Sequence, residues 1–220
     1  MTSLQIDVAF DFICPWCLIG KRQLDKALEM LAESHPQTEV SVEWQGVQLL
    51  PQLPPNGLPF ADFYRQRLGS DEAVRLRQAH VQTAAASAGL KLDLSRIERM
   101  PNTANAHRLF QQVRTRANPA QLAMLLERLF AGYFCYREDI GDRDTLTQIV
   151  TQLDGLESAP LLSSLEDRQP PYQSELGALS VPAFVINQQV HLFGAQPAEA
   201  LYTALCQQLA NMSSETDKSL

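Results

Sequence analysis

The feature that most constrains this chain is a pair of cysteines, Cys14 and Cys17, which lie between a strand pattern and a helix pattern. Before them, Leu4 to Phe10 alternates in polarity, which predicts a strand. After them, apolar residues recur at steps of three and four from Leu18 to Glu33, which predicts a helix. Two thiols at such a junction can close and reopen a small disulfide, so the motif favours a redox site over a structural one.

The cysteine pair has two other interpretations. A zinc site needs about four ligands, usually a second Cys or His pair at short spacing. The other cysteines, Cys135 and Cys206, stand alone, and the four histidines are scattered without paired spacing. Chance proximity of two buried cysteines is the second alternative, and the flanking strand and helix argue against it. We therefore expect no metal ion.

Composition excludes several classes of function. The 220 residues are 45% hydrophobic, which is enough for a sizeable core. There are 18 Lys and Arg against 25 Asp and Glu, a net charge of −7, and no basic stripe indicates nucleic acid or an anionic membrane as a partner. The first residues, Met1 to Asp7, contain neither a basic start nor an apolar signal core. We expect a cytoplasmic protein, where disulfides are usually transient, catalytic or redox-sensing.

The rest of the chain falls into a helical block and a second strand region. Val40, Val42 and Trp44 alternate with polar residues and predict a strand that pairs with the first in a parallel βαβ unit. A proline-rich loop follows. Helical periodicity then dominates, with predicted helices at 62–68, 71–88, 104–116, 119–134, 144–153 and 159–168. The end of the chain predicts a hairpin at 182–186 and 190–193, then a helix from Pro197 through Leu209.

This order predicts an α/β protein with a thioredoxin-like fold (βαβ…ββα) and a large all-helical insertion. Residues 1–50 and 175–212 form a discontinuous thioredoxin-like domain in this interpretation. Residues 58–170 form the inserted helical domain, and 213–220 form a flexible tail. The two ends must share one sheet, because two strands alone rarely stand in water.

Five motifs occur in order along nearly the whole chain, at residues 11–21, 102–109, 139–142, 181–186 and 193–197. They read DFICPWCLIGK, NTANAHRL, DIGD, VPAFVI and FGAQP. With them the chain resembles the DsbA-like oxidoreductases, most closely the FrnE-type branch. The resemblance implies a thioredoxin core, a helical insert and a cis proline at Pro182 that faces the disulfide. Position 18, often Tyr in this branch, is Leu here.

The resemblance extends to a second group, the kappa-class glutathione transferases and the 2-hydroxychromene-2-carboxylate isomerases. Members of that group share the fold but typically carry Ser where this chain has Cys14, and they lack the paired thiol. The presence of both cysteines favours dithiol chemistry.

The position of the cysteines assigns their roles. Cys14 is expected at a helix N-terminus, where unpaired N–H groups and the helix dipole stabilise a thiolate, so it is the predicted nucleophile. Cys17, one turn into the helix, is the predicted resolving thiol. Pro15 lacks an N–H donor, and Trp16 adds an apolar cover without charge. With no cation between the cysteines, we expect a potential between the reducing and strongly oxidising extremes.

Four further residues complete the predicted site. In the geometry that the resemblance implies, the backbone of Val181, next to Pro182, faces Cys14 and could pair with an extended substrate. Asn102 and His107 have two interpretations. The first is a helix N-cap followed by a buried polar contact. The second places their helix beside the disulfide, where it shapes a substrate pocket.

Three functional hypotheses follow. The first is a thiol–disulfide oxidoreductase that acts on a disulfide-containing protein or small molecule. It binds no cofactor and uses glutathione at most as a redox co-substrate. The second is a glutathione-dependent isomerase or transferase for a small aromatic or polyketide-like compound, whose activity survives loss of Cys17. The third is a non-enzymatic binding or redox-sensing protein. The paired thiols favour the first.

Overall fold

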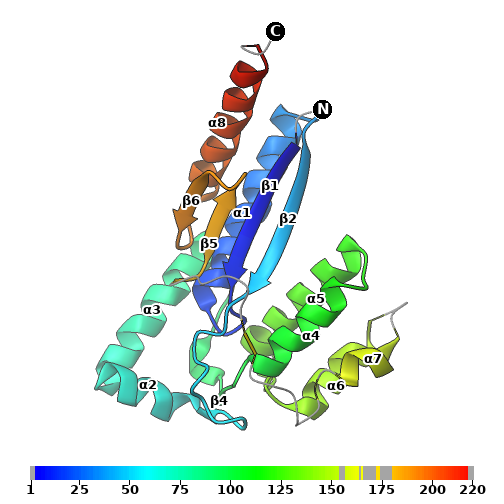
Figure 1. Ribbon diagram of the computed structural model, residues 1–220. Coiled ribbons are helices and arrows are strands. Elements are labelled where there is room, and N and C mark those ends of the chain that lie inside the picture. Colours follow the sequence, from blue (N-terminus) through cyan, green and yellow to red (C-terminus); the bar gives the residue numbers. More distant parts are fainter. Residues whose placement is uncertain (1–2, 154–156, 164, 166–171, 174–179, 218–220) are drawn as a thin grey trace. The chain divides into compact units, whose positions relative to one another are not determined.

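The computed structural model describes residues 3–153, 157–163, 165, 172–173 and 180–217, with side chains up to residue 212. The chain divides into two compact units (Figure 1). The first unit comprises Met1–Phe10, Trp16–Gln45 and Glu175–Leu220. The second comprises Asp11–Pro15 and Gly46–Ser174. The domain boundaries given above stay a prediction.

The first unit contains a four-stranded sheet with the order β2-β1-β5-β6. Its strands are β1 (Ser3–Phe10), β2 (Glu39–Gly46), β5 (Ala183–Ile186) and β6 (Val190–Phe193). Helix α1 (Pro15–Ser34) connects β1 to β2, and the two arrows point the same way in Figure 1. β5 pairs antiparallel with β1, and β6 pairs antiparallel with β5. Helix α8 (Ala198–Asp217) ends the chain, and the thioredoxin-like fold is confirmed.

The core of this unit follows from the alternation in β1. Leu4, Ile6 and Val8 are buried on one face of the strand because every second side chain points the same way. They pack into one cluster with the buried stripes of α1 and α8, which include Leu24 and Leu201. Each such side chain contributes about 1.5–3 kcal/mol by leaving water. This packing fixes the position of α1 on β1.

The hairpin between β5 and β6 turns through two residues with left-handed backbone. Asn187 and Gln188 have φ of 49° and 58°, and the N–H of Gln189 donates to the carbonyl of Ile186 at 3.0 Å. Asn tolerates this conformation better than most residues. Its side-chain oxygen also accepts the N–H of Gln5 at 2.9 Å, which ties the turn to β1.

The second unit is mainly helical, and three of its helices, α3, α5 and α6, begin directly after a capping residue. Ser70 caps α3, Asp142 caps α6, and Asn118 forms a capping box with Gln121 ahead of α5, which has Pro119 at its first position. The α-helices are α2 (Phe60–Leu68), α3 (Asp71–Ser87), α4 (Ala104–Arg114), α5 (Pro119–Ala131), α6 (Arg143–Thr151) and α7 (Ser158–Ser163). A 3-10 turn covers Leu94–Arg96.

Several boundaries differ from those predicted. Helix α1 begins at Pro15 rather than Leu18, because a proline is well suited to the first turn of a helix. The predicted helix 119–134 ends at Ala131 and gives way to a π-helical turn, η2 (Gly132–Tyr136). The short antiparallel pair β3 (Leu58–Pro59) and β4 (Arg99–Met100) was not predicted. Strands of two residues are too short to show a periodicity.

The C-terminal ends of the last two predicted helices also differ from the prediction. Helix α8 continues to Asp217, past the predicted end at Leu209, so residues 213–217 of the predicted tail are helical, and the flexibility of that tail stays a prediction. Residues 218–220 of that tail lie outside the described residues. Helix α7 ends at Ser163, and most of the remainder of the predicted helix 159–168 also lies outside them. No helix within the described part of the chain is long and apolar enough to cross a membrane.

Candidate functional site

Both cysteines lie at the start of α1. Helix α1 begins at Pro15, so Cys14 directly precedes it and Cys17 is its third residue. The N–H of Cys14 donates to the carbonyl of Asp11 at 3.1 Å, which closes the turn between β1 and the helix. Both cysteines are present as thiols, and their exposed fractions are 7% for Cys14 and 1% for Cys17. Cys14 is therefore the more accessible of the two thiols.

The start of α1 is a favourable place for negative charge. The unpaired N–H groups and the macrodipole of a helix stabilise an anion at its N-terminus. No acidic residue occupies the first turn of α1, so no carboxylate competes there with a thiolate. Pro15 is buried and Trp16 is half-buried, so the two residues between the cysteines cover the turn without charging it.

Asp11 belongs to the same turn, and sequence reasoning missed it. Its side chain is completely buried. One carboxylate oxygen, Oδ2, accepts the N–H of Leu49 at 2.8 Å, and the other, Oδ1, lies 3.0 Å from Nε2 of His107. An isolated acidic residue inside the apolar run from Ala9 to Ile13 was the available signal, because a buried charge needs partners of its own.

His107, on α4, is buried and contacts the turn through Asp11. Its ring lies 5.0 Å, centroid to centroid, from the rings of both Phe12 and Tyr172, and it stacks on Tyr172 at 19°. Gly46 leaves room for this ring, since a Cβ there would collide with Nδ1 of His107. The buried polar contact foreseen for His107 is present, and its role in substrate binding stays a prediction.

Asn102 links three segments of the second unit. Its oxygen accepts from Nε2 of Gln48 at 2.7 Å and from the N–H of Ala104 at 3.0 Å, and its Nδ2 donates to the carbonyl of Leu53 at 2.7 Å. The residue directly before α4 is Thr103, whose side chain makes no cap bond. Asn102 thus satisfies the helix start from one position further out. Its contact with a substrate also stays a prediction.

Pro182 precedes β5 and packs against α1 within the first unit. The Val181–Pro182 peptide bond is cis, the isomer that the resemblance implied. A Cβ on Gly20 would lie 3.0 Å from Cγ of Pro182 and 3.1 Å from Cζ of Phe184. The absence of a side chain at Gly20 therefore sets how closely the buried proline approaches the helix. That Val181 and Pro182 face Cys14 stays a prediction.

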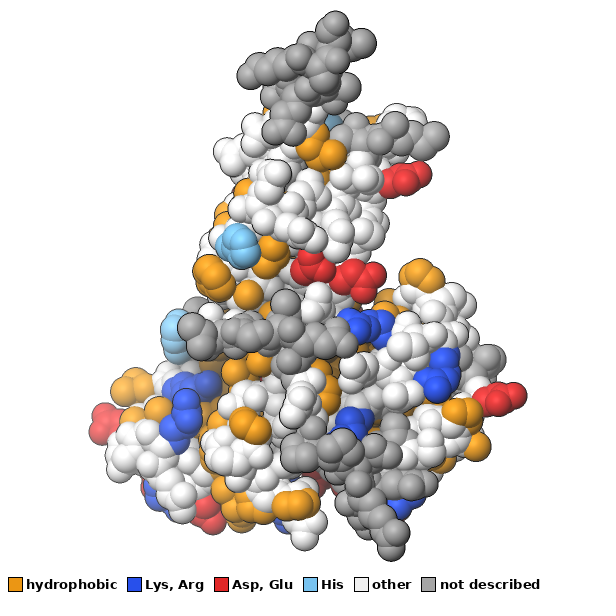
Figure 2. Space-filling view, viewed as in Figure 1, with side chains coloured by type: hydrophobic (Ala, Val, Ile, Leu, Met, Phe, Trp, Pro, Cys, Tyr) orange, Lys and Arg blue, Asp and Glu red, His pale blue; other side chains and the backbone are white. Residues whose placement is uncertain are grey.

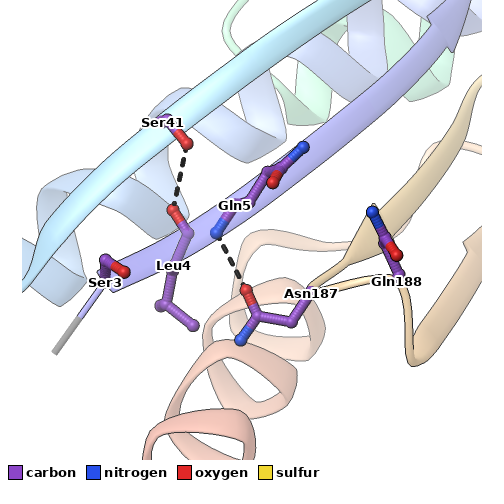
Figure 3. Close-up of a pocket in the computed structure, with 6 residues that line it drawn as sticks. All are labelled: Ser3, Leu4, Gln5, Ser41, Asn187 and Gln188. Carbon is purple, nitrogen blue, oxygen red and sulfur yellow. Dashed lines mark hydrogen bonds between the residues drawn. The ribbon is translucent and has the colours of Figure 1, made fainter.

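A separate open pocket lies at the other end of β1 (Figure 3). Its volume is about 330 Å³, and it is lined by Ser3, Leu4, Gln5, Ser41, Asn187 and Gln188. The Asn187 and Ser41 side chains bond backbone groups of β1, and the lining contains no charged or thiol group. The pocket therefore contains none of the thiol groups that the cysteine turn offers. Among the described residues, no three potential metal ligands come together.

A βαβ…ββα sheet, a Cys-x-x-Cys at the start of its first helix and a proline directly before its third strand define the thioredoxin class of proteins. The model of the DSBA-like thioredoxin domain family matches residues 5–206. The chain belongs to this family.

The similar proteins agree with that assignment. The uncharacterized protein YwbO of Bacillus subtilis (strain 168) is 26% identical over 199 residues, which cover 86% of this chain and 89% of YwbO. Among solved structures, a protein described as a probable DsbA oxidoreductase from Streptomyces coelicolor has a TM-score of 0.79 at 25% identity. The match covers 93% of this chain and 89% of that chain.

Two more distant structures share the fold. The cytosolic disulfide reductase DsbM from Pseudomonas aeruginosa, solved with GSH, has a TM-score of 0.61 at 17% identity, covering 94% of this chain and 99% of that one. A 2-hydroxychromene-2-carboxylate isomerase has a TM-score of 0.62 at 15% identity, covering 94% and 98%. Both groups named by the resemblance are therefore represented among the structural neighbours.

Proposed function

We propose that this protein is a thiol–disulfide oxidoreductase that exchanges disulfides through Cys14 and Cys17. The observation that carries the proposal is the difference between the two thiols at one helix start. Cys14 precedes α1 and is 7% exposed, whereas Cys17 is its third residue and 1% exposed. Residues three apart on a helix lie on the same face, so the second thiol can reach a bond formed on the first.

The reaction proceeds in two exchanges. The Cys14 thiolate attacks one sulfur of the substrate disulfide, so a mixed disulfide forms and the other substrate sulfur leaves as a thiolate that takes up a proton. The Cys17 thiolate then attacks the sulfur of Cys14, which forms the Cys14–Cys17 disulfide and releases the second substrate thiol. The substrate gains two electrons and the protein loses them. In the reverse direction, the same two exchanges oxidise a dithiol substrate.

The substrate is a disulfide-containing protein or small molecule, and two molecules of glutathione are the proposed reductant that regenerates the thiols. Each turnover would convert them to glutathione disulfide. A cytoplasmic location fits this direction, because glutathione there keeps thiols reduced. The name of the Pseudomonas aeruginosa neighbour, a cytosolic disulfide reductase solved with GSH, is consistent with this proposal.

The proposal is tested by equilibrating the protein in a series of glutathione buffers that differ in redox potential. Free thiols at Cys14 and Cys17 are quantified by peptide mass spectrometry, with Cys135 and Cys206 as internal controls. We expect one reversible two-electron transition at Cys14 and Cys17, and we expect Cys14→Ser to abolish it. Cys17→Ser should accumulate a mixed disulfide on Cys14. Undiminished turnover in Cys17→Ser would instead favour a glutathione-dependent isomerase or transferase. Undiminished turnover in Cys14→Ser would exclude disulfide exchange through Cys14 and would also favour that alternative, since its members typically carry Ser at this position.

A further inference from the structure

The loop that follows β2 is hydrogen-bonded to the turn that carries Cys14. The N–H of Leu49 donates to Oδ2 of Asp11 at 2.8 Å, and the carbonyl of Asp11 accepts the N–H of Cys14 at 3.1 Å. Both segments belong to the second unit. Since one aspartate bonds both, its covalent dimensions place the backbone nitrogens of Leu49 and Cys14 no more than about 11 Å apart.

This loop is held in place at both of its ends. The Asn102 side chain accepts from Nε2 of Gln48 at 2.7 Å and donates to the carbonyl of Leu53 at 2.7 Å. The N–H of Leu53 donates to the carbonyl of Leu50 at 3.1 Å, and the side chains of Val47 and Leu53 are buried. A segment fixed in this way loses little further conformational entropy when it binds a ligand.

Between its buried ends the loop presents apolar side chains to solvent. Leu49 is 39% exposed, Leu50 is half-buried and Pro51 is exposed, and we call these three residues the apolar tip. No charged residue occurs between Glu43 and Asp62 in the sequence. Figure 2 shows hydrophobic side chains at the surface in several places over the second unit, which contains this loop.

The position of Leu49 distinguishes it from other exposed apolar residues, which are common on protein surfaces. The other exposed large apolar side chains in the described part of the chain are Val40, Leu76, Met124, Tyr136 and Phe193. Leu49 differs from them because its backbone is bonded to the cysteine turn. An exposed apolar side chain next to a nucleophile is placed to contact whatever that nucleophile attacks.

The distance between the two residues suits a peptide substrate. An extended chain advances about 3.3 Å per residue, so side chains two or three positions from the attacked half-cystine can reach the apolar tip. Pro15 and Trp16, which follow Cys14 in the chain, are uncharged as well. A disulfide in an extended apolar segment therefore meets matching surface on this side of the thiol.

We propose that Leu49 is a specificity-determining residue that selects disulfides flanked by apolar residues. The inference rests on the proposed function, and it narrows the substrate class to disulfides in extended, apolar segments of polypeptide. Asn102 serves this selection by holding the loop, which gives it a role without direct contact with the substrate. Covering the exposed part of one leucine side chain is worth about tenfold in affinity.

The test compares three disulfides as substrates of the reduced, full-length protein. Two are peptide disulfides that are identical except for the residues two and three positions after the cysteine, which are Leu in one peptide and Ser in the other. The third, 2-hydroxyethyl disulfide, is too short to reach Leu49. Single-turnover rate constants for the two peptides are each divided by the value for 2-hydroxyethyl disulfide. We expect the wild type to prefer the Leu peptide about tenfold.

Three variants locate the source of this preference. Leu49→Ser removes the apolar side chain and keeps the N–H that bonds Asp11, whereas Leu49→Met keeps an apolar side chain. Leu76→Ser, at a leucine of α3 that is 66% exposed, is the matched control. We expect the ratio of the two peptide rate constants to fall close to one in Leu49→Ser and to stay near the wild-type value in the other two variants.

Folding of each variant is checked by circular dichroism and thermal unfolding. A wild-type protein that reduces all three disulfides without preference, or a folded Leu49→Ser protein that keeps the preference, would overturn this inference alone. An equal loss of preference in Leu76→Ser would also overturn it, since surface apolarity in general would then be responsible. A wild type that reduces none of the three disulfides would overturn the proposed function, and this inference with it.

Discussion

Nε2 of His107 lies 3.0 Å from Oδ1 of Asp11, and neither side chain is exposed to solvent. The pair joins α4 to the turn before Cys14, because the carbonyl of Asp11 accepts the N–H of Cys14. A buried carboxylate is tolerated only when its oxygens are satisfied. Here Leu49 satisfies one oxygen and His107 the other. The geometry of the cysteine turn thus depends on a residue 96 positions away in the sequence.

Removing His107 should destabilise the protein strongly. His107→Ala leaves a buried carboxylate with one partner fewer, and breaking such a pair typically costs about 3–5 kcal/mol. We expect this loss in the free energy of unfolding measured by urea denaturation. The double variant Asp11→Ala/His107→Ala should lose less than the sum of the single losses. His191→Ala, at an exposed position of β6, is the control and should change stability by less than about 0.5 kcal/mol.

Gly46 is predicted to be intolerant of a side chain. In Gly46→Ala the new Cβ would collide with Nδ1 of His107 and lie 2.8 Å from the Tyr172 hydroxyl, which donates to the Gly46 carbonyl. Overpacking of this kind typically costs about 1–3 kcal/mol. The control is the same substitution in a His107→Ala background, where the ring is absent and the loss in unfolding free energy should be smaller. An equal loss in both backgrounds would show that the ring is not the obstacle.

The fold and the cysteine motif could be predicted from the sequence because both depend on local patterns of residues. Alternation in Leu4 to Phe10 and the helical spacing after Leu18 appear within a single element, and the order of such elements predicts the sheet. The position of Pro182 came from the family pattern. Neither kind of signal needs a distance between remote residues.

The contacts between residues far apart in the sequence could not be predicted in the same way. Asp11 meets His107 and Tyr64 meets Arg77 only after folding, and a single sequence contains no information on those distances. Arg77 lies in α3 between Leu76 and Gln78, and an arginine in a surface helix is usually solvated. In the sequence, Gly46 cannot be distinguished from any other glycine at the end of a strand. The His107 ring that it accommodates lies far away in the sequence.

Gly20→Ala is expected to disturb the approach of Pro182 to α1. Replacing a helix-interior glycine by alanine normally stabilises by about 1 kcal/mol. Here the added Cβ would stand 3.0 Å from Pro182 and 3.1 Å from Phe184, both buried rings with little freedom to move. We expect a net loss of about 1 kcal/mol or more in unfolding free energy, measured in urea. Glu29→Ala, on the exposed side of α1, is the control without such neighbours. A stabilised Gly20→Ala protein would contradict the close packing.

The buried tyrosines predict a loss of stability in alkali. Burial raises the pKa of Tyr133 well above its usual value, and the nearby Tyr64 and Asp11 raise it further. The unfolded chain therefore releases this proton first, near pH 10, while the folded protein retains it. By linkage, the contribution of Tyr133 is fully present below that pH and is lost as the pH rises toward the folded pKa.

Unfolding free energies measured in urea at a series of alkaline pH values test whether stability falls with rising pH, as predicted. Tyr133→Phe has no proton to release, so its stability should fall less steeply with pH than that of the wild type above about pH 10. The control is Tyr136→Phe, three residues later and 63% exposed, which should retain the wild-type slope. The absorbance of tyrosinate offers a second measurement, in which the late ionisation expected of folded Tyr133 should be missing from Tyr133→Phe. Equal slopes in wild type and Tyr133→Phe would mean that Tyr133 ionises as readily in the folded protein as in the unfolded chain.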